Sequence, residues 1–377
     1  MQQSLDEYKI AIVCDWLTNV GGAERVVKSL HEIFPDAPIY TSQYVPERID
    51  WFNEAVVRTG WLNRFPKNMH KFFPVLRGIY FSHLNLRDYD IVISSTGAEA
   101  KAVKTRPDAL HVSYMHAPTQ YYWSLYDQYL EHPGFGKLDP LARIALRLLV
   151  RPLRFFDKRF AQRPDAIIAN STYIQNEILM YYERQSTVIF PPVQTDKFSD
   201  DTTRSRHGFV TTSRQVPWKR LDLAISACMK TGDSLVIVGD GSEHDRLVEQ
   251  AKDSPNITFL PTQDLKGLKK ILTQSEGFIF PSLEPFGIAP VEALSAGTPV
   301  IAYGEGGALD YIDDGVNGLL FSEQTTDSLT DALTRFRSTS FDEKVVKQSA
   351  EDFSDELFKE KIIAYITSQV KEKHAKR

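Results

Sequence analysis

Short apolar runs of three to five residues recur along the chain, and polar or amphipathic segments separate them. A strand that is covered on both faces reads as a continuous apolar run, whereas a half-exposed strand alternates. The runs therefore predict buried strands of parallel sheets. The predicted strands are Ile10–Cys14, Ile91–Ser94, His111–Met115, Ala166–Ala169, Thr187–Phe190, Phe209–Thr212, Leu235–Val238, Ile257–Leu260, Phe278–Phe280, Pro299–Ala302 and Gly318–Phe321.

Amphipathic helical patterns lie between these runs. Ala23–Phe34 and Leu221–Thr231 are two examples in which apolar residues recur three and four positions apart. Strands and helices that alternate through the whole chain are typical of the α/β class, in which helices cover both faces of a doubly wound sheet.

The chain has 377 residues, more than a single hydrophobic core usually serves, so we expect two domains. Residues 191–208 are polar and turn-rich, and they separate two alternating series. The prediction is an N-terminal Rossmann-like domain at 1–195, a C-terminal one at 196–354, and a helix within 355–377 that crosses back to the N-terminal domain. Because ligands of such sheets bind beyond the carboxyl ends of the strands, a deep cleft between the domains is the expected site.

Composition narrows the class of protein. A hydrophobic content of 42% and a charged content of 25% are ordinary for a soluble globular protein, and the net charge of −5 gives no bulk attraction to nucleic acid. The two cysteines, Cys14 and Cys228, fall in a predicted strand and a predicted helix, which argues against a disulfide framework or a zinc cluster. The N-terminus lacks a secretory signal pattern, and no apolar run approaches ~20 residues. We expect a cytoplasmic protein.

Two cations follow the predicted strand Phe209–Thr212. Arg214 comes two residues after the strand, and Lys219 stands where the next helix begins. Basic side chains beside a helix N-terminus favour an anion, and a guanidinium fork with a mobile ammonium group suits a diphosphate. Taken alone, two cations in a loop are more often a solvated turn.

The turn after Leu235–Val238 contains Gly239 and Gly241, but His244 stands where a dinucleotide-binding fingerprint has its third glycine. A tight strand–helix turn explains both glycines without a ligand. We therefore predict no nicotinamide or flavin cofactor here.

Two glutamates, Glu284 and Glu292, are separated by seven residues. Glu284 is predicted in the loop after the strand Phe278–Phe280, and Glu292 one turn inside the next helix. Carboxylates only accept hydrogen bonds, so they bind pairs of sugar hydroxyls well. Backbone amides around Gly287 and Ile288 would point at a ligand from the helix start. Cations, amides and acids together fit a nucleotide sugar.

These residues also resemble the sequence motifs of a known protein family. Residues 284–292 resemble the E-x7-E motif of the family-4 retaining glycosyltransferases of GT-B fold, and "EALSAGTPVIAYGEGG" continues the likeness. Arg214 and Lys219 match the arginine and lysine that hold the donor diphosphate in that family. The segments "DWLTNVGGAERV", "YMHAPTQYYW", "ANSTYIQNEI" and "VIFPPVQTDKF" resemble further blocks of the family in the same order. Nearly the whole chain is covered, and the likeness is greatest to the WbaZ-like O-antigen mannosyltransferases.

The resemblance implies a GT-B fold, two Rossmann-like domains facing across a deep cleft, and a retaining glycosyltransferase. It assigns catalytic roles to His116, Glu284, Arg214 and Lys219, with His116 contacting the donor sugar. The residues that it assigns to donor binding are Gly21, Gly22, Arg214, Lys219, Phe286, Gly287, Ile288 and Glu292.

The expected donor is GDP-mannose, and the expected acceptor is a glycan or lipid-linked saccharide of surface polysaccharide biosynthesis. Gln120, Ser124 and Pro285 depart from the residues usual in the group, and these departures bear on the sugar and acceptor contacts. No Asp-x-Asp motif follows a predicted strand, so we expect side chains rather than a metal ion to offset the phosphate charge.

Two basic stretches remain, at residues 55–87 and 142–163, and both mix cations with aromatic or aliphatic residues. This composition suits peripheral docking on an anionic membrane, here at the inner face of the cytoplasmic membrane. RNA binding and a simple solvated helix face are the alternatives. The arginines expected to dock are Arg143, Arg147, Arg151 and Arg154.

Other functions share this architecture. The donor could be a UDP-sugar in a glucosyl- or N-acetylglucosaminyltransferase. A GT-B-fold epimerase would turn over nucleotide sugar without an acceptor, and a phosphorylase would need lysine-bound pyridoxal phosphate. A non-catalytic binding protein would be expected to lose some of Glu284, Glu292, Arg214 and Lys219, and all four are present.

Overall fold

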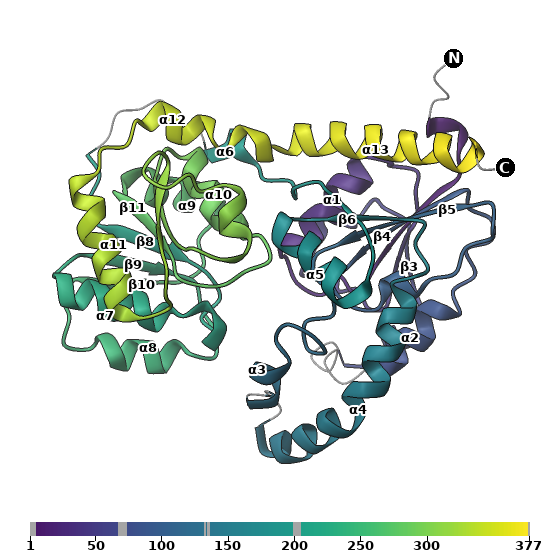
Figure 1. The fold of residues 1–377 in the computed structure, drawn as a ribbon, viewed down its shortest axis with the longest axis horizontal. Helices are drawn as coiled ribbons and strands as arrows, with labels where there is room; N and C mark the ends of the chain where they lie inside the picture. The colour runs from purple at the N-terminus through teal and green to yellow at the C-terminus, as the bar shows by residue number, and fades with distance from the viewer. Residues whose placement is uncertain (1–4, 67–73, 132, 134–135, 199–204, 376–377) are drawn as a thin grey trace. The chain divides into compact units, whose positions relative to one another are not determined.

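The computed structural model describes residues 5–66, 74–131, 133, 136–198 and 205–375. The chain forms two compact units, each built around one parallel sheet (Figure 1). Unit 1 comprises Met1–Pro191 with Phe358–Arg377, and unit 2 comprises Pro192–Leu357. The predicted α/β class with two Rossmann-like sheets is confirmed.

Unit 1 contains a seven-stranded sheet in the order β3-β2-β1-β4-β5-β6-β7, and every neighbouring pair is parallel. Because all strands run the same way, their carboxyl ends share one edge. The strands are β1 (Ile10–Cys14), β2 (Ile39–Thr41), β3 (Val57–Thr59), β4 (Ile91–Thr96), β5 (Leu110–Met115), β6 (Ala166–Ala169) and β7 (Thr187–Val188).

Two strands of this sheet, β2 and β3, are absent from the sequence prediction. Each is only three residues long, and β3 is an edge strand whose residues are half-buried or exposed. A run this short has no apolar signature of its own, so pairing with a neighbour decides its conformation.

Helices cover both faces of the unit 1 sheet, and alternate residues of β1 point into the two cores. Ile10, Ile12 and Cys14 face one core, while Ala11 and Val13 face the other. This two-sided burial explains why the strand reads as a continuous apolar run. The helices of this unit are α1 (Gly22–Ile33), α2 (Pro74–Ser82), α3 (Tyr126–Glu131), α4 (Asp139–Phe160) and α5 (Thr172–Tyr182).

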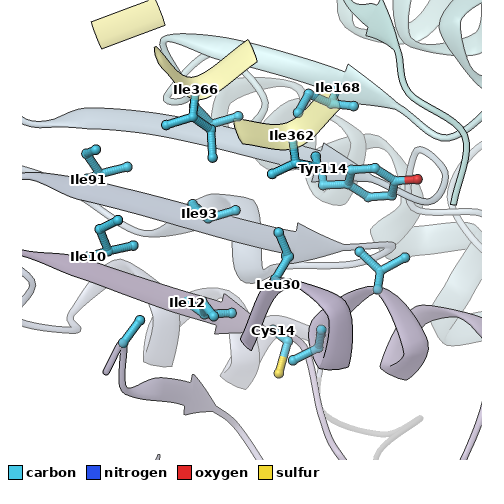
Figure 2. Close-up of a cluster of buried hydrophobic side chains, with 14 of the residues drawn as sticks. Ile10, Ile12, Cys14, Leu30, Ile91, Ile93, Tyr114, Ile168, Ile362 and Ile366 are labelled. Carbon is cyan, nitrogen blue, oxygen red and sulfur yellow. The ribbon is translucent and has the colours of Figure 1, made fainter. Parts of the chain in front are cut away.

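The last helix, α13 (Asp355–Ala375), supplies part of the first of these cores. Phe358, Ile362, Ile366 and Val370 recur every four residues, so they form one stripe along the helix. Figure 2 shows Ile362 and Ile366 directed at the strand residues of β4 and β6 and at Tyr114. The helix therefore belongs to the hydrophobic core of unit 1, although it begins in unit 2.

Unit 2 contains a six-stranded parallel sheet in the order β10-β9-β8-β11-β12-β13. The six strands predicted for this half are all present, within one residue of their predicted limits. They are β8 (Phe209–Thr212), β9 (Leu235–Val238), β10 (Ile257–Leu260), β11 (Gly277–Phe280), β12 (Val300–Tyr303) and β13 (Gly318–Phe321). The helices are α6 (Thr195–Phe198), α7 (Leu221–Thr231), α8 (His244–Ala251), α9 (Leu265–Gln274), α10 (Ile288–Ser295), α11 (Thr326–Ser338) and α12 (Glu343–Gln348).

The buried stripe of α13 can be tested with neighbouring isoleucines. Ile366 is fully buried, whereas Ile363 is 42% exposed. Removing a buried isoleucine side chain to alanine costs about 2–5 kcal/mol, because apolar contacts are lost and a cavity remains. We expect Ile366→Ala to lower the thermal unfolding midpoint by several degrees and Ile363→Ala to leave it nearly unchanged. Equal shifts for the two variants in calorimetry would contradict this packing.

Candidate functional site

Lys219 and Glu284 form an ion pair in unit 2, although 64 residues separate them in the sequence. Lys219 ends a short 3-10 turn after β8, and Glu284 lies in the loop after β11. These two strands are neighbours in the sheet, so their loops leave the same edge side by side. The Ser282 hydroxyl also donates to Glu284 Oε1, at 2.8 Å.

The pair is accessible but not fully solvated. The side chain of Lys219 is 15% exposed and that of Glu284 is 18% exposed. A cation and an acid at this depth keep their charges available to a polar ligand while much of the surrounding water is excluded. Their contact brings together two of the four residues assigned to catalysis from the sequence.

Close backbone packing holds the Glu284 loop. Gly306 has φ of +75°, and a Cβ atom there would lie 2.6 Å from the carbonyl oxygen of Glu284. The Gly307 amide donates to that same carbonyl, at 2.9 Å. A Cβ atom on Gly307 would lie 2.3 Å from Cα of Phe286. Glycine is therefore required at both positions for the two loops to approach each other.

The acidic motif continues into α10, which begins at Ile288 after Gly287. Gly287 has φ of +92°, a conformation that side-chain-bearing residues rarely adopt. The Phe286 side chain is buried against Tyr311, and the Phe286 carbonyl accepts a hydrogen bond from the Tyr311 hydroxyl at 2.9 Å. Glu292 lies in the middle of α10 and is 4% exposed. Of the two acids of the motif, Glu284 is thus the more accessible.

Arg214 lies in the same β8–α7 loop as Lys219, and its side chain is exposed. The helix after this loop begins at Leu221, two residues beyond Lys219. Arg214 is therefore placed by the loop backbone, at the same sheet edge as the ion pair.

His116 belongs to unit 1 and follows β5 directly. Its Nε2 atom is 2.8 Å from the Ser95 hydroxyl oxygen, and its backbone amide donates to the Thr96 carbonyl at 2.8 Å. Desolvation by burial lowers the pKa of His116 to about 4. The imidazole is thus neutral near pH 7, and it can offer hydrogen bonds but no positive charge.

Thr96, the last residue of β4, and the segment after it are held by Asp15, which directly follows β1. The Asp15 carboxylate accepts hydrogen bonds from the backbone amides of Gly97, Ala98 and Ala100 at 2.7–3.0 Å, and from the Thr96 hydroxyl. Sequence reasoning missed this residue, because an aspartate after a strand has no distinctive pattern.

Gly21 and Gly22, the glycine pair of the predicted first loop, lie at the start of α1. Gly21 is the N-cap, and it has extended backbone with φ of −158°. A Cβ atom at Gly21 would lie 2.8 Å from a carboxylate oxygen of Glu24. The Glu24 side chain therefore lies close to the backbone of Gly21 at the start of α1.

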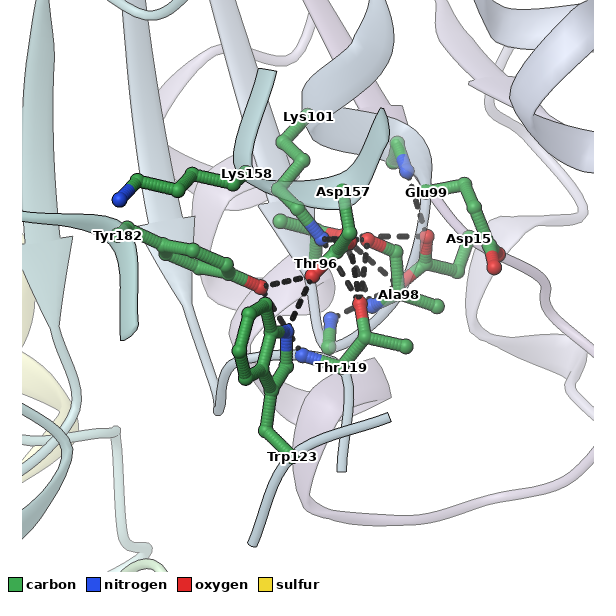
Figure 3. Close-up of polar contacts among 12 residues, drawn as sticks. Asp15, Thr96, Ala98, Glu99, Lys101, Thr119, Trp123, Asp157, Lys158 and Tyr182 are labelled. Atoms are coloured by element: carbon green, nitrogen blue, oxygen red, sulfur yellow. Dashed lines mark hydrogen bonds and ion pairs between the residues drawn. The ribbon is translucent and has the colours of Figure 1, made fainter. Parts of the chain in front are cut away.

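A buried carboxylate, Asp157, anchors α4 to the rest of unit 1 (Figure 3). Its two oxygens contact Lys101 Nζ at 2.7 Å, the Thr119 hydroxyl at 2.8 Å, Trp123 Nε1 at 2.8 Å and the Tyr182 hydroxyl at 2.7 Å. Four donors satisfy a charge that would otherwise be costly to bury. A single acid within the basic segment 140–164 is the sequence signal that could have revealed it.

A second buried ion pair, Arg77–Glu99, lies beside the pair of Lys101 and Asp157. Arg77 Nε donates to Glu99 at 2.7 Å, and the Tyr121 hydroxyl donates to the other oxygen of Glu99 at 2.6 Å. Burial raises the pKa of Glu99, and the charge of Arg77 opposes this rise. Because Glu99 directly precedes one short 3-10 turn and Lys101 lies within it, both buried pairs hold the same segment after β4.

The four predicted docking arginines lie on α4, but they differ in their surroundings. Arg147 and Arg151 are exposed. Arg143 donates to the Glu131 carbonyl at 2.7 Å, and Arg154 donates to the Tyr122 carbonyl at 2.6 Å. Residues 67–73 of the other basic stretch lie outside the described residues. Within the described part of the chain, none of the helices has the length and apolar character to cross a membrane.

Comparison with known proteins identifies the family. The family model for glycosyl transferases group 1 matches residues 194–375, and the model for glycosyltransferase family 4 matches residues 20–197. Together the two models account for nearly the whole chain, and they correspond to its two halves. The chain belongs to the family-4 glycosyltransferases of GT-B type.

Several individual proteins are similar to this chain. A glycosyltransferase of Methanocaldococcus jannaschii is 24% identical over 213 residues, covering 56% of this chain and 60% of that protein. The D-inositol 3-phosphate glycosyltransferase of Mycolicibacterium smegmatis is 28% identical over 193 residues, covering 45% and 44%. The matched region thus spans about half the length of these relatives.

Solved structures share the fold. The structure of Anabaena Alr3699/HepE in complex with UDP has a TM-score of 0.67 and 17% identity, covering 95% of this chain and 100% of that chain. The sucrose-phosphate synthase of Thermosynechococcus elongatus has a TM-score of 0.67 and 15% identity, covering 96% and 99%. At these identities the likeness concerns the fold alone.

The neutral state of His116 can be measured directly. Since its pKa is near 4, we expect the imidazole signals in nitrogen-15 NMR to stay constant from pH 8 to pH 5.5 and to move only in more acidic solution. His116→Asn would identify the signals by removing them. A titration midpoint near 6.5 would show that the ring is solvated and would contradict this description.

Proposed function

We propose that this protein is a retaining glycosyltransferase that transfers a hexose from a nucleotide sugar to a saccharide acceptor. The contact between Lys219 and Glu284 is the observation that carries the proposal. It places an ammonium group and a carboxylate at one sheet edge of unit 2, and the loop of the carboxylate leads into the start of α10. Cations and amides suit a diphosphate, and a carboxylate suits sugar hydroxyls.

The proposed chemistry uses the positive charge of this edge. As the bond between the sugar C1 atom and the diphosphate oxygen breaks, negative charge develops on the leaving phosphate. Lys219 and Arg214 stabilise that charge, which lowers the barrier electrostatically. The acceptor hydroxyl oxygen forms the new bond to C1 on the same face, and its proton passes to the leaving phosphate oxygen. In this proposal side chains supply the neutralising charge without a divalent metal ion.

His116 and Glu284 are proposed to orient the donor sugar. Glu284 accepts hydrogen bonds from sugar hydroxyls, and neutral His116 exchanges a hydrogen bond rather than a charge. Glu292 is proposed to bind the ribose hydroxyls, with backbone amides at Gly287 and Ile288 on the phosphates. Each of these roles is carried from the family resemblance onto the matching residue.

GDP-mannose is the donor that we propose first, on the likeness to O-antigen mannosyltransferases, with a glycan or lipid-linked saccharide of surface polysaccharide biosynthesis as acceptor. UDP-glucose is the second candidate. It is favoured by the fold shared with Anabaena Alr3699/HepE, whose structures include complexes with UDP and with UDP-glucose. An epimerase or a non-catalytic binding protein would lack acceptor-dependent release of nucleoside diphosphate.

The proposal is tested by incubating the protein separately with GDP-mannose, UDP-glucose and UDP-N-acetylglucosamine, with and without EDTA, and following nucleoside diphosphate release. We expect Lys219→Ala to lower kcat by ~10²–10³-fold, because it removes a charge that stabilises the leaving group. Lys230→Ala is the matched control, since Lys230 pairs with Asp327 on the exposed surface of the same unit. Unchanged turnover in Lys219→Ala would refute the assignment, and loss of activity in EDTA would refute metal independence.

We further propose that unit 1 docks peripherally on the cytoplasmic face of an anionic membrane through α4. Val150 and Asp157 are the buried residues of this helix, so its opposite face is free of the unit 1 core. That face carries an apolar stripe whose members are strongly exposed, with Leu148 at 72%. The stripe comprises Leu141, Ile144, Leu148 and Phe155, at spacings of three, four and seven residues.

The positive charge on this face of α4 supports an anionic membrane as its binding partner. Arg147 and Arg151 are exposed beside the stripe, and Asp157, the only acid between residues 140 and 164, is turned inward. Apolar side chains flanked by exposed arginines match a surface that has acyl chains beneath anionic headgroups. Arg143 and Arg154 contribute less in this proposal, because both bond to backbone carbonyls of unit 1.

Membrane docking is tested by sedimentation with vesicles that contain anionic or only neutral lipid. Each exposed arginine near an anionic surface is worth ~1 kcal/mol, so removing two should weaken partitioning about 30-fold. We expect this from Arg147→Ala combined with Arg151→Ala, and a larger loss from Leu148→Asp. The control combines Lys266→Ala and Lys270→Ala, which removes two exposed cations of unit 2. Equal binding by all variants would refute the proposal.

A further inference from the structure

The loops after β8 and β9 are joined backbone to backbone. Gly239 has φ of +128°, and a Cβ atom there would lie 2.2 Å from the Ser213 carbonyl oxygen. A Cβ atom on Gly241 would lie 2.3 Å from the Gln215 carbonyl oxygen. The amide of Gln215 donates to the Asp240 carbonyl at 2.9 Å. The two glycines after β9 therefore serve contact with the β8 loop.

The side chain of Gln215 connects the loop after β8 to the loop after β9 and to the start of α8 through two hydrogen bonds. It is fully buried, and its Nε2 atom donates to the Gly239 carbonyl at 2.7 Å. That bond orients the amide so that Oε1, which can only accept, lies 2.8 Å from Nδ1 of His244. Nδ1 of His244 must then carry the proton. His244 is the first residue of α8, and its ring packs edge-on against Phe259.

We infer that Gln215, held by His244 and Gly239, is a positioning residue for the diphosphate-binding cations of unit 2. Gln215 directly follows Arg214, whose exposed side chain depends on the backbone for its position. The Val216 amide donates to the Arg214 carbonyl at 3.0 Å, and the Lys219 amide donates to the Val216 carbonyl at 3.0 Å. Both cations thus stand within one short, hydrogen-bonded segment whose one fully buried side chain is that of Gln215.

This inference rests on the proposed function, because it assumes that Arg214 and Lys219 bind a nucleoside diphosphate. It adds a requirement that the loop be held before ligand arrives. A cation that must be ordered on binding costs affinity, whereas a loop already fixed against its neighbour does not. His244 thereby gains a role that its place in an incomplete glycine fingerprint did not predict.

The experiment measures binding of GDP and UDP by calorimetry, together with kcat and KM for the nucleotide sugar. Gln215→Leu removes both side-chain hydrogen bonds and should weaken nucleoside diphosphate binding about tenfold, mainly as a rise in KM. His244→Phe removes one bond but keeps an aromatic ring against Phe259, and it should cause a smaller loss. His244→Asn keeps an N–H donor near the position of Nδ1, so it should recover part of the affinity relative to His244→Phe.

Gln250→Leu is the matched control. The Gln250 amide donates to the Asp222 carbonyl and to the Ser226 hydroxyl, both at 2.9 Å. The Gln250→Leu variant therefore loses two side-chain hydrogen bonds, as Gln215→Leu does, but it leaves the Arg214–Lys219 segment unchanged. We expect a similar change of unfolding temperature but unchanged nucleotide affinity.

The outcomes distinguish the positioning role of Gln215 from the proposed function of the protein. If the wild type binds GDP or UDP and both Gln215→Leu and His244→Phe bind it equally well, the positioning role is refuted and the proposed function stands. If Gln215→Leu and Gln250→Leu weaken binding to the same extent, the effect is general destabilisation and the inference is wrong. If the wild type binds neither nucleotide, the proposed function itself is contradicted.

Discussion

Parallel pairing of every strand is the constraint on which the rest of this structure depends. A parallel sheet requires a crossover after each strand, so helices cover both faces and the carboxyl ends of all strands meet at one edge. In unit 2 this geometry brings the loops after β8 and β11 together, and with them Lys219 and Glu284. The same constraint sets the loops of β8 and β9 against each other and requires glycine at the contact.

The two units satisfy buried polar groups in different ways. In unit 1 complete ion pairs lie below the surface, as in Lys101–Asp157 and Arg77–Glu99. The carboxylate of each pair also accepts hydrogen bonds from hydroxyl or indole donors, so each pair is costly to break and contributes to a unique arrangement of the loops. In unit 2 the pair of Lys219 and Glu284 stays partly exposed. A partly exposed pair can exchange its partner for a ligand, whereas a fully buried one cannot do so without unfolding its surroundings.

Helix α4 shows how an internal anchor and an external surface can share one element. Asp157 and Val150 turn one side of the helix inward, and this fixes which side faces solvent. The exposed side then carries Leu148, the neighbouring apolar residues and two exposed arginines. The membrane docking that we propose would cover this stripe, whose exposed apolar area is unfavourable in water.

By itself the sequence determined the class of fold and the place of the acidic motif, because buried strands and amphipathic helices each leave a periodic pattern. Strands such as Ile10–Cys14 and Phe209–Thr212 were predictable to the residue for this reason. Short strands such as Val57–Thr59 were decided only by pairing, since three residues contain no period. The sequence also predicted Arg214, Lys219 and Glu284 as ligand-binding residues, from their positions after strands together with the family resemblance.

Only the tertiary structure decided which side chains meet. The Lys219–Glu284 contact, the four donors on Asp157 and the bond between Gln215 and His244 join residues from different loops or helices. No local pattern encodes such contacts, because they arise from strand order in the sheet. The physical reason for the division is that periodicity records burial one element at a time, whereas a site is built where several elements end together.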